Sequence, residues 1–244
     1  MRVDGRQNDE VRETKLTVGY QSFAEGSVLI EMGNTKVVCA ATIEERVPSF
    51  LRGEGKGWVT AEYAMLPRST LTRTSRDVAA GAVKGRHHEI QRLIGRSLRA
   101  VTDLASLGER TVTVDCDVLQ ADAGTRTAAI TGGYVALSQA LHGLVGNGIL
   151  KRVPLKTSLA AVSVGLVEES LLLDLCYEED YRAKVDFNFA MTGEGDLVEI
   201  QATGEDGPFG RRLVEEAMAL AQKGINELLK AQEEVVASLK TRRQ

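Results

Sequence analysis

Aromatic residues and cysteines are scarce in this chain of 244 residues. Phe, Trp and Tyr together make up 5% of the sequence. Modules that bind single-stranded nucleic acid by stacking need aromatic platforms, and this composition offers few of them. The three cysteines, Cys39, Cys116 and Cys176, are widely spaced and lie in apolar runs. An odd number of such cysteines predicts reduced, buried thiols in a cytoplasmic protein.

Other features that are missing exclude further classes of protein. No run of about 18 apolar residues is present, so the sequence predicts no membrane span. Residues 1–12 are polar and charged, unlike a signal peptide. Only three histidines occur, and His87 and His88 are adjacent, which argues against a zinc site. The net charge of −4 gives no global cationic field, so any contact with nucleic acid must come from a local basic cluster.

The hydrophobic periodicity predicts an α+β chain in two similar halves. The first half contains predicted strands at 27–32, 35–42, 57–65 and 111–119, of which the first two are joined at Gly33-Asn34. An amphipathic helix is predicted at 86–107. A helix of small residues then runs to about 145. The second half contains predicted strands at 159–167, 171–177, 184–191 and 197–203. One long helix is predicted at 211–239. Because each half runs from strands to helix, we expect one pseudo-duplicated domain over residues 1–244.

The sharpest local signal is Gly124-Thr125-Arg126, which lies between a predicted strand and a predicted helix. The start of a helix presents unpaired N–H groups and a positive dipole end, which suit a phosphate. Arg86 opens the amphipathic helix, and Arg86 and Arg126 could hold one phosphate together. An ordinary capped helix with an exposed arginine fits these residues equally well. The motif differs from a Walker loop, because the lysine and the second glycine of that loop are missing.

An acidic group surrounds a predicted turn between two strands in the second half. Asp180 and Asp186 could approach each other across this turn. Such a pair suits Mg²⁺, which takes one or two carboxylates together with substrate phosphates. Alternatively, one of the two carboxyl groups delivers a proton. A charged hairpin turn without further function is the simplest interpretation of the same residues.

Basic residues are concentrated between positions 68 and 99, where the sequence has eight Lys and Arg. Only three acidic residues occur between position 68 and Asp103. Arg68, Arg73 and Arg76 lie in an aperiodic segment, 68–85, which reads as a long loop. These arginines could grip the phosphates of a nucleic acid, with an affinity that falls steeply with salt. A solvated loop is the alternative. The arginine face of the helix at 86–107 is interpreted as a subunit or ion-pair surface.

Several motifs, taken in order, resemble the ribonuclease PH family of phosphorolytic exoribonucleases over about residues 1–230. They are DGR at 4–6, GKGWVTAEYAMLPR at 55–68, RTSR at 73–76, GRHHEIQRLIGR at 85–96, DCDVLQADAGTRT at 115–127 and LCYEED at 175–180. The resemblance implies duplicated βαβα units of the ribosomal protein S5 domain 2 type. It also implies a homo-hexameric ring built as a trimer of dimers.

The activity that the resemblance implies is 3′→5′ trimming of tRNA precursors and other structured RNA 3′ ends. Inorganic phosphate is the co-substrate, nucleoside 5′-diphosphates are released, and Mg²⁺ or Mn²⁺ is the cofactor. The family's catalytic residues correspond to Arg86, Arg126, Asp180 and Asp186. Its phosphate-binding residues correspond to Arg86, Gly124, Thr125 and Arg126. Its metal ligands correspond to Asp180 and Asp186, and its tRNA-binding loop to Arg68, Arg73 and Arg76.

Two departures from the family pattern are visible. Ala123 stands where a second glycine is usual, and His87-His88 replace small polar residues. An alanine would restrict the phosphate loop if its position needs a positive φ. Two rival functions stay open at this point. One is a non-catalytic ring subunit that only contacts RNA, and the other is an exonuclease that uses water in place of phosphate.

Overall fold

The structure is a computed structural model that describes residues 2–76 and 85–241. A first sheet of five strands has the order β1-β2-β3-β5-β4. Its strands are β1 (Thr14–Val18), β2 (Gly26–Met32), β3 (Thr35–Glu44), β4 (Trp58–Met65) and β5 (Thr111–Gln120). A second sheet of four strands has the order β7-β6-β8-β9. Its strands are β6 (Leu159–Val167), β7 (Ser170–Leu173), β8 (Ala183–Thr192) and β9 (Leu197–Gly204). The predicted α+β class is confirmed.

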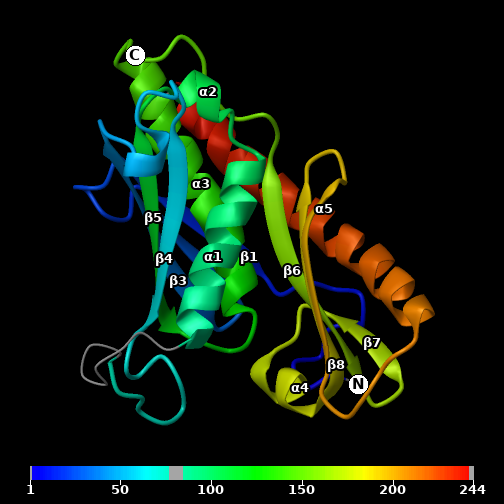
Figure 1. The fold of residues 1–244 in the computed structure, drawn as a ribbon. Helices are drawn as coiled ribbons and strands as arrows, with labels where there is room; N and C mark the ends of the chain where they lie inside the picture. The colour runs from blue at the N-terminus through cyan, green and yellow to red at the C-terminus, as the bar shows by residue number, and fades with distance from the viewer. Residues whose placement is uncertain (1, 77–84, 242–244) are drawn as a thin grey trace.

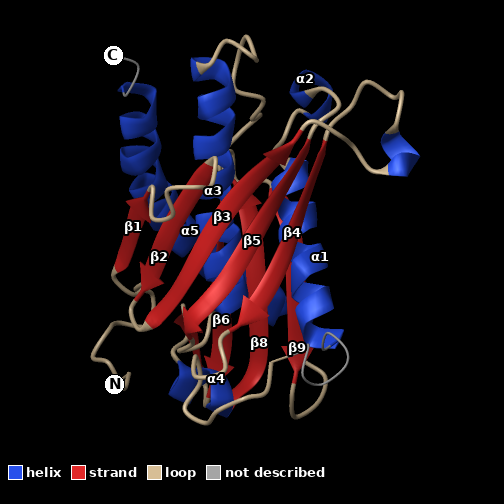
Figure 2. Ribbon diagram, turned by 90° about the vertical axis from the view of Figure 1, so that its left-hand side faces the viewer, coloured by secondary structure: helices blue, strands red, loops and turns tan. Residues whose placement is uncertain are grey.

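The helices lie between and beside the two sheets. They are the short 3₁₀ helix η1 (Ser49–Leu51) and the α-helices α1 (Gly85–Ala100), α2 (Leu104–Leu107), α3 (Thr125–Gly146), α4 (Tyr177–Arg182) and α5 (Arg211–Thr241). Helices α1 and α3 occupy the space between the sheets, and α5 packs against the second sheet (Figure 1). Figure 2 shows the first sheet face-on, with α1 and α3 behind it.

Helix α3 has small, apolar residues on every side because it is covered by both sheets. It packs on β2 and β3 of the first sheet and on β6 of the second. A helix that is apolar all round belongs in a core. At Gly132 a β-carbon would come within 2.7 Å of Ile30 Cγ2 and 3.1 Å of Cys39 Sγ. The glycine thus allows the helix to approach the sheet closely, and one hydrophobic core joins the two halves.

The structure corrects the prediction of a single helix over 86–107. The chain leaves helical geometry after α1, where Thr102 forms an isolated antiparallel bridge with Leu155. Asp103 then caps α2 by accepting a hydrogen bond from the backbone of its first turn. Apolar residues continue at helical spacing through this break because both helices face the same core. The periodicity therefore could not reveal where the helix ends.

The predicted strand over 171–177 is also wrong in its second part. Strand β7 ends at Leu173, and the expected turn that follows is the short helix α4. Cys176 precedes α4, and the carboxylate of Glu179 accepts a hydrogen bond from the Cys176 N–H at 3.1 Å. This reciprocal cap starts a helix in a run of acidic residues that alone suggests an exposed turn. Strand β1 was not predicted.

The cysteine prediction is confirmed, since Cys39, Cys116 and Cys176 are all free and buried. Cys39 and Cys116 face each other across the β3–β5 pair. Burial and the hydrogen bond with Cys39 raise the pKa of the Cys116 thiol well above its usual value. Within the described part of the chain, no helix is long and apolar enough to span a membrane.

Candidate active site

Two segments far apart in sequence meet at one edge of the first sheet. Strands β4 and β5 are parallel, so both end at the same edge. The chain returns from β4 to begin α1 near this edge, and β5 runs directly into the loop that begins α3 (Figure 1). This topology brings Arg86, in the first turn of α1, to the same edge as Thr125 and Arg126 at the start of α3.

The loop between β5 and α3 is held in place by hydrogen bonds with buried polar side chains. The Thr35 hydroxyl donates to the carbonyl of Ala123 at 2.6 Å and accepts from the Asp122 N–H at 3.0 Å. Arg12 Nη1 donates to the carbonyl of Asp122. These bonds fix the loop at the start of α3, and because the first N–H groups of a helix have no partner within the helix, such a start can bind an anion.

Ala123 and Gly124 both adopt the left-handed backbone conformation, with φ of 56° and 62°. A β-carbon at Gly124 would lie 2.8 Å from Arg12 Nη2, so only glycine fits there. Ala123 is the position where the family pattern has a second glycine, and its positive φ explains that preference. An alanine in this conformation is strained by about 1–2 kcal/mol. The loop forms nevertheless, because its contacts with Arg12 and Thr35 over-determine its shape.

Tyr63 on β4 supports Thr125 at the start of α3. The Tyr63 hydroxyl is 2.8 Å from Thr125 Oγ1, and the tyrosine is 2% exposed. Its ring makes an edge contact with His87, with centroids 5.5 Å apart. Burial raises the pKa of Tyr63, while its hydrogen bond with Thr125 and the charges of Arg86 and Arg126 oppose that rise. Both arginines therefore lie close to this hydroxyl.

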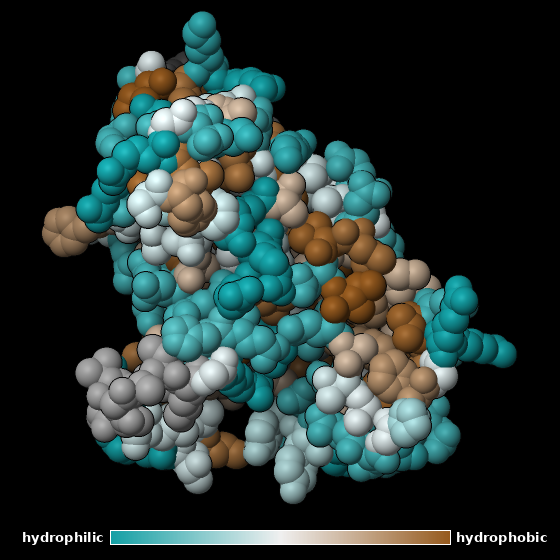
Figure 3. Space-filling view, in the orientation of Figure 1, coloured by the Kyte–Doolittle hydropathy of each residue, from teal (hydrophilic) through white to brown (hydrophobic). Residues whose placement is uncertain are grey.

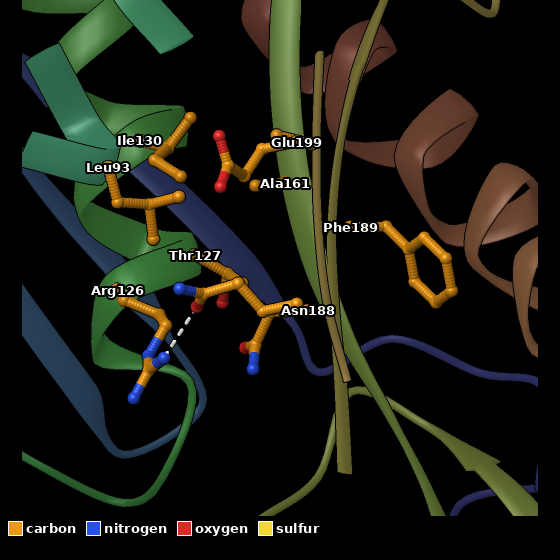
Figure 4. Close-up of a pocket in the computed structure, with 10 residues that line it drawn as sticks. Leu93, Arg126, Thr127, Ile130, Ala161, Asn188, Phe189 and Glu199 are labelled. Carbon is orange, nitrogen blue, oxygen red and sulfur yellow. Dashed lines mark hydrogen bonds between the residues drawn. The ribbon is translucent and has the colours of Figure 1, made fainter. Parts of the chain in front are cut away.

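Arg126 reaches across from α3 to the second sheet. Its Nη1 donates to Gln201 Oε1 on β9 at 2.6 Å, drawn as the dashed line in Figure 4. Gln201 Nε2 in turn donates to Glu89 Oε1 on α1 at 2.9 Å. Arg126 lines the cavity shown there from the side of α3, and Asn188 on β8 lines it from the side of the second sheet. One glutamine thus joins both arginine-bearing helices to the second sheet.

The two aspartates come from the second half of the chain. Asp180 lies on α4 and Asp186 on β8. Desolvation raises the pKa of Asp180, and the charges of Arg86, Arg126 and Arg12 act against this rise. The pKa of Asp186 is also raised, by desolvation and then by the negative charge of Asp180. Asp180 thus lies within the electrostatic influence of Arg86 and Arg126, and Asp186 within that of Asp180 and Arg126.

A buried ion pair fixes α4 in place. Arg2 donates two hydrogen bonds to the carboxylate of Glu179, at 2.8 and 2.7 Å. The two side chains are 1% and 4% exposed. The backbone N–H of Tyr177 donates to Asp122 Oδ1 at 2.8 Å, which ties α4 to the phosphate loop. The N-terminal segment thus holds the element that carries Asp180.

A second buried pair lies beneath the phosphate loop. Arg12 Nη2 donates to Asp174 Oδ1 at 2.6 Å and its Nε to Asp174 Oδ2 at 2.9 Å. Arg6 adds a hydrogen bond to the Asp174 carbonyl at 2.9 Å. Asp174 itself has a φ of 52° and is fully buried.

Sequence reasoning missed Tyr63, Gln201, Arg12 and Asp174. Nothing in their local patterns marks them, because their roles depend on partners far along the chain.

The arrangement suits a divalent cation held jointly with a substrate. Residues 2–76 and 85–241 contain no cluster of three or more His, Cys, Asp or Glu that could hold a metal alone. Desolvation raises the pKa of Asp186 most, and the negative charge of Asp180 raises it further, so a cation bound here would offset both effects. Two such carboxylates fit Mg²⁺, which retains several waters and also binds substrate phosphates.

The predicted RNA-binding arginines are carried by a different segment of the chain from Arg126, Asp180 and Asp186. Arg68, Arg73 and Arg76 are exposed on the segment after β4. Arg68 Nη1 donates to the Leu71 carbonyl at 3.0 Å. Desolvation raises the pKa of Asp117 on β5, and the charge of Arg76 acts against that rise. The rest of the predicted loop, 77–84, lies outside the described residues.

Comparisons with known proteins agree on one family. Residues 10–141 match the family described as "3′ exoribonuclease family, domain 1", and residues 157–224 match its domain 2. The chain is 56% identical over 240 residues to a protein named ribonuclease PH from Bacillus cereus (strain G9842), covering 98% of both chains.

Solved structures share the fold at low sequence identity. Rice (Oryza sativa) Rrp46 superposes with a TM-score of 0.74 at 18% identity and is covered completely, as is this chain. The Archaeoglobus fulgidus exosome with RNA bound to the active site contains a chain that superposes with a TM-score of 0.78 at 20% identity. This match covers 96% of this chain and 92% of that one.

Proposed function

We propose that the site described above carries the chemistry of this chain, which belongs to the 3′ exoribonuclease family of ribonuclease PH. The chain is a phosphorolytic exoribonuclease that processes tRNA. Inorganic phosphate is the co-substrate. It attacks the phosphorus of the last phosphodiester, the bond to the 3′ oxygen of the preceding nucleotide breaks, and a nucleoside 5′-diphosphate leaves. The reverse reaction adds a nucleotide.

The observation that carries this proposal is the convergence of two arginines and two aspartates. Phosphate is a nucleophile at neutral pH, so no Ser, Cys or His base is needed to activate it. Arg86, Arg126 and the start of α3 would hold the phosphate in line with the scissile bond, with Thr125 as a further donor. Gly124 allows the phosphate to approach the backbone.

Asp180 and Asp186 would serve the departing 3′ oxygen. Desolvation raises the pKa of each carboxyl, which favours its protonated form, and a proton delivered by one of them would neutralise the oxygen as the bond breaks. The same two residues would hold Mg²⁺ or Mn²⁺, which when bound supplies positive charge to the phosphates. Loss of activity on chelation, restored by added Mg²⁺, would support the metal role.

Arg68, Arg73 and Arg76 would bind the body of the tRNA outside the cleft. We propose a homo-hexamer, a trimer of dimers, in which repeated loops turn several weak contacts into a stronger one. Strand β9 is an edge strand on which Leu197 and Ile200 are 44% and 42% exposed. Figure 3 shows hydrophobic residues gathered near β9 and α5 on a mainly hydrophilic face. Exposed apolar residues on an edge strand mark a surface that another chain can cover. Residues 1–244 would act as one domain in each subunit.

The test uses a tRNA with an extended 3′ tail, incubated with and without inorganic phosphate. We expect trimming only with phosphate, and nucleoside diphosphates as the sole product. Nucleoside monophosphates formed equally without phosphate would establish hydrolysis instead. Binding of the tRNA without any release of nucleotides, with phosphate and Mg²⁺ present, would identify a non-catalytic ring subunit.

A further inference from the structure

Two exposed tyrosines stack on each other on the helix that carries Asp180. The ring centroids of Tyr177 and Tyr181 are 6.4 Å apart, with 26° between the ring planes. Tyr177 is 48% exposed and Tyr181 is 81% exposed. Single exposed aromatics are common on protein surfaces. A stacked pair is more informative in a chain with 5% aromatic residues, because it presents a preformed π surface to solvent.

The tyrosines lie on the side of α4 that adjoins the catalytic carboxylate. At about 100° per residue, Tyr177 is about 60° and Tyr181 about 100° around the helix from Asp180. Glu179 lies about 100° from Asp180 in the other direction, where its buried carboxylate pairs with Arg2. The buried side of α4 is therefore turned away from the rings, and the rings form the rim next to Asp180.

The position of this rim is fixed relative to the phosphate site. The N–H of Tyr177 donates to Asp122 Oδ1 at 2.8 Å, one residue before the left-handed pair that opens α3. The Arg2–Glu179 pair holds the opposite side of the helix. The rings thus need little ordering when a ligand binds, which favours affinity.

We propose that Tyr177 and Tyr181 form a stacking platform for a base next to the scissile phosphodiester of the RNA. The inference rests on the proposed function, in which Arg86 and Arg126 hold phosphate and are not free to stack on the adjoining base. Every base has a π face, so a tyrosine platform accepts any base. This tolerance suits an enzyme that removes successive nucleotides irrespective of sequence.

Binding of RNA oligomers in phosphate-free buffer tests the platform, since no phosphorolysis occurs there. The probe carries 2-aminopurine at its 3′ end, and its fluorescence falls on stacking. We expect Tyr181→Ala to weaken binding about tenfold and to remove most of the fluorescence change, as is typical when a stacking aromatic is deleted. Tyr181→Phe should retain both, because the ring face remains. Tyr20→Ala, which removes another exposed tyrosine, of 49% exposure, from a different part of the surface, is the control.

A second oligomer, in which the last two nucleotides lack bases, shows whether the loss of affinity depends on a base. On this RNA, wild type and Tyr181→Ala should bind with equal affinity, because no base is present to stack. An equal loss on both oligomers, or no loss on either, overturns the platform. A lower native mass for Tyr181→Ala would also overturn it, by placing the pair between subunits. Phosphate-dependent release of diphosphates by wild type tests the function separately, so either idea can fail alone.

Discussion

Arg126 is a partly exposed residue at the start of α3, a helix whose residues are mostly buried. It donates to Gln201 at 2.6 Å and lies 3.9 Å from Glu89, so it is oriented before any phosphate arrives. Arg126→Ala should lower kcat/KM for phosphorolysis about 100- to 1000-fold, as expected when one preorganised donor is removed. Affinity for tRNA, measured without phosphate, should not change.

The matched control for that variant is Arg212→Ala. Arg212 is also ion-paired with a glutamate, Glu216, but lies exposed on α5. It should keep the activity of the wild type. Wild-type turnover by Arg126→Ala would instead remove this residue from the phosphate site.

Ala123 offers a test of backbone strain. Because its φ is 56°, Ala123→Gly should raise the free energy of unfolding by about 1 kcal/mol, the relief of strain exceeding the entropy cost of glycine. Ala219→Gly is the control, since Ala219 is exposed inside α5, where the same change should cost about 1 kcal/mol. Urea unfolding measures both. A loss of stability in both variants would show that position 123 is not strained.

At the scale of elements, α4 depends on the N-terminal segment. Burial alone would raise the pKa of Glu179, but hydrogen bonds from Arg2 and from the Cys176 N–H lower it below the usual 4.5. A carboxyl group whose pKa is lowered on folding stabilises the folded state above its unfolded pKa. This stabilisation is lost as the pH falls below about 4.5 through the folded pKa.

Glu179→Gln should therefore destabilise the protein at pH 7 by about 3 kcal/mol, since Arg2 stays buried without a counter-ion. The variant should also lose less stability than wild type on acidification below pH 4.5. Urea unfolding at a series of pH values checks both results. Glu216→Gln, at an exposed position on α5, should change stability by less than about 0.5 kcal/mol. An unchanged pH dependence in Glu179→Gln would contradict the assignment.

For the whole molecule, we expect the exposed arginines beyond β4 to contribute to the binding of large RNAs. Replacing Arg68, Arg73 and Arg76 with alanine should lower the affinity for tRNA more than the affinity for a short oligomer that reaches only the active site. Each lost phosphate contact should reduce the slope of log K against log salt by about 0.7–0.9. Filter binding over a salt series measures this. Equal losses on tRNA and oligomer would place these arginines inside the cleft.

The number of subunits is a second property of the whole molecule. A homo-hexamer should give a native mass six times that of the 26.4 kDa chain. Native mass spectrometry or light scattering measures it directly. Leu197→Glu, on the exposed edge of β9, should lower that mass if this edge is covered in the ring, because a charge would be buried there. An unchanged hexamer would move the interface to another face.

Much of the fold could be predicted from local pattern. The alternation in β5 and the hairpin of β2 and β3 are properties of neighbouring residues, and the structure confirms them. The break between α1 and α2 and the helix α4 could not be predicted, because a bridge to Leu155 and a carboxylate bound to Arg2 determine them. These partners lie far away along the chain.

Motifs in the chain were sufficient to identify the family and its phosphate-dependent activity, since they are contiguous and keep their order. The positions of Arg86, Arg126, Asp180 and Asp186 in sequence say nothing of their mutual distance. Only the packing of α1 and α3 against both sheets brings their charges together, as the shared electrostatic influence on Asp180 shows. Pairwise charge and desolvation depend on separation in space, which is decided by how distant elements pack. That is why Tyr63, Gln201 and the buried Arg12–Asp174 pair became visible only in the folded chain.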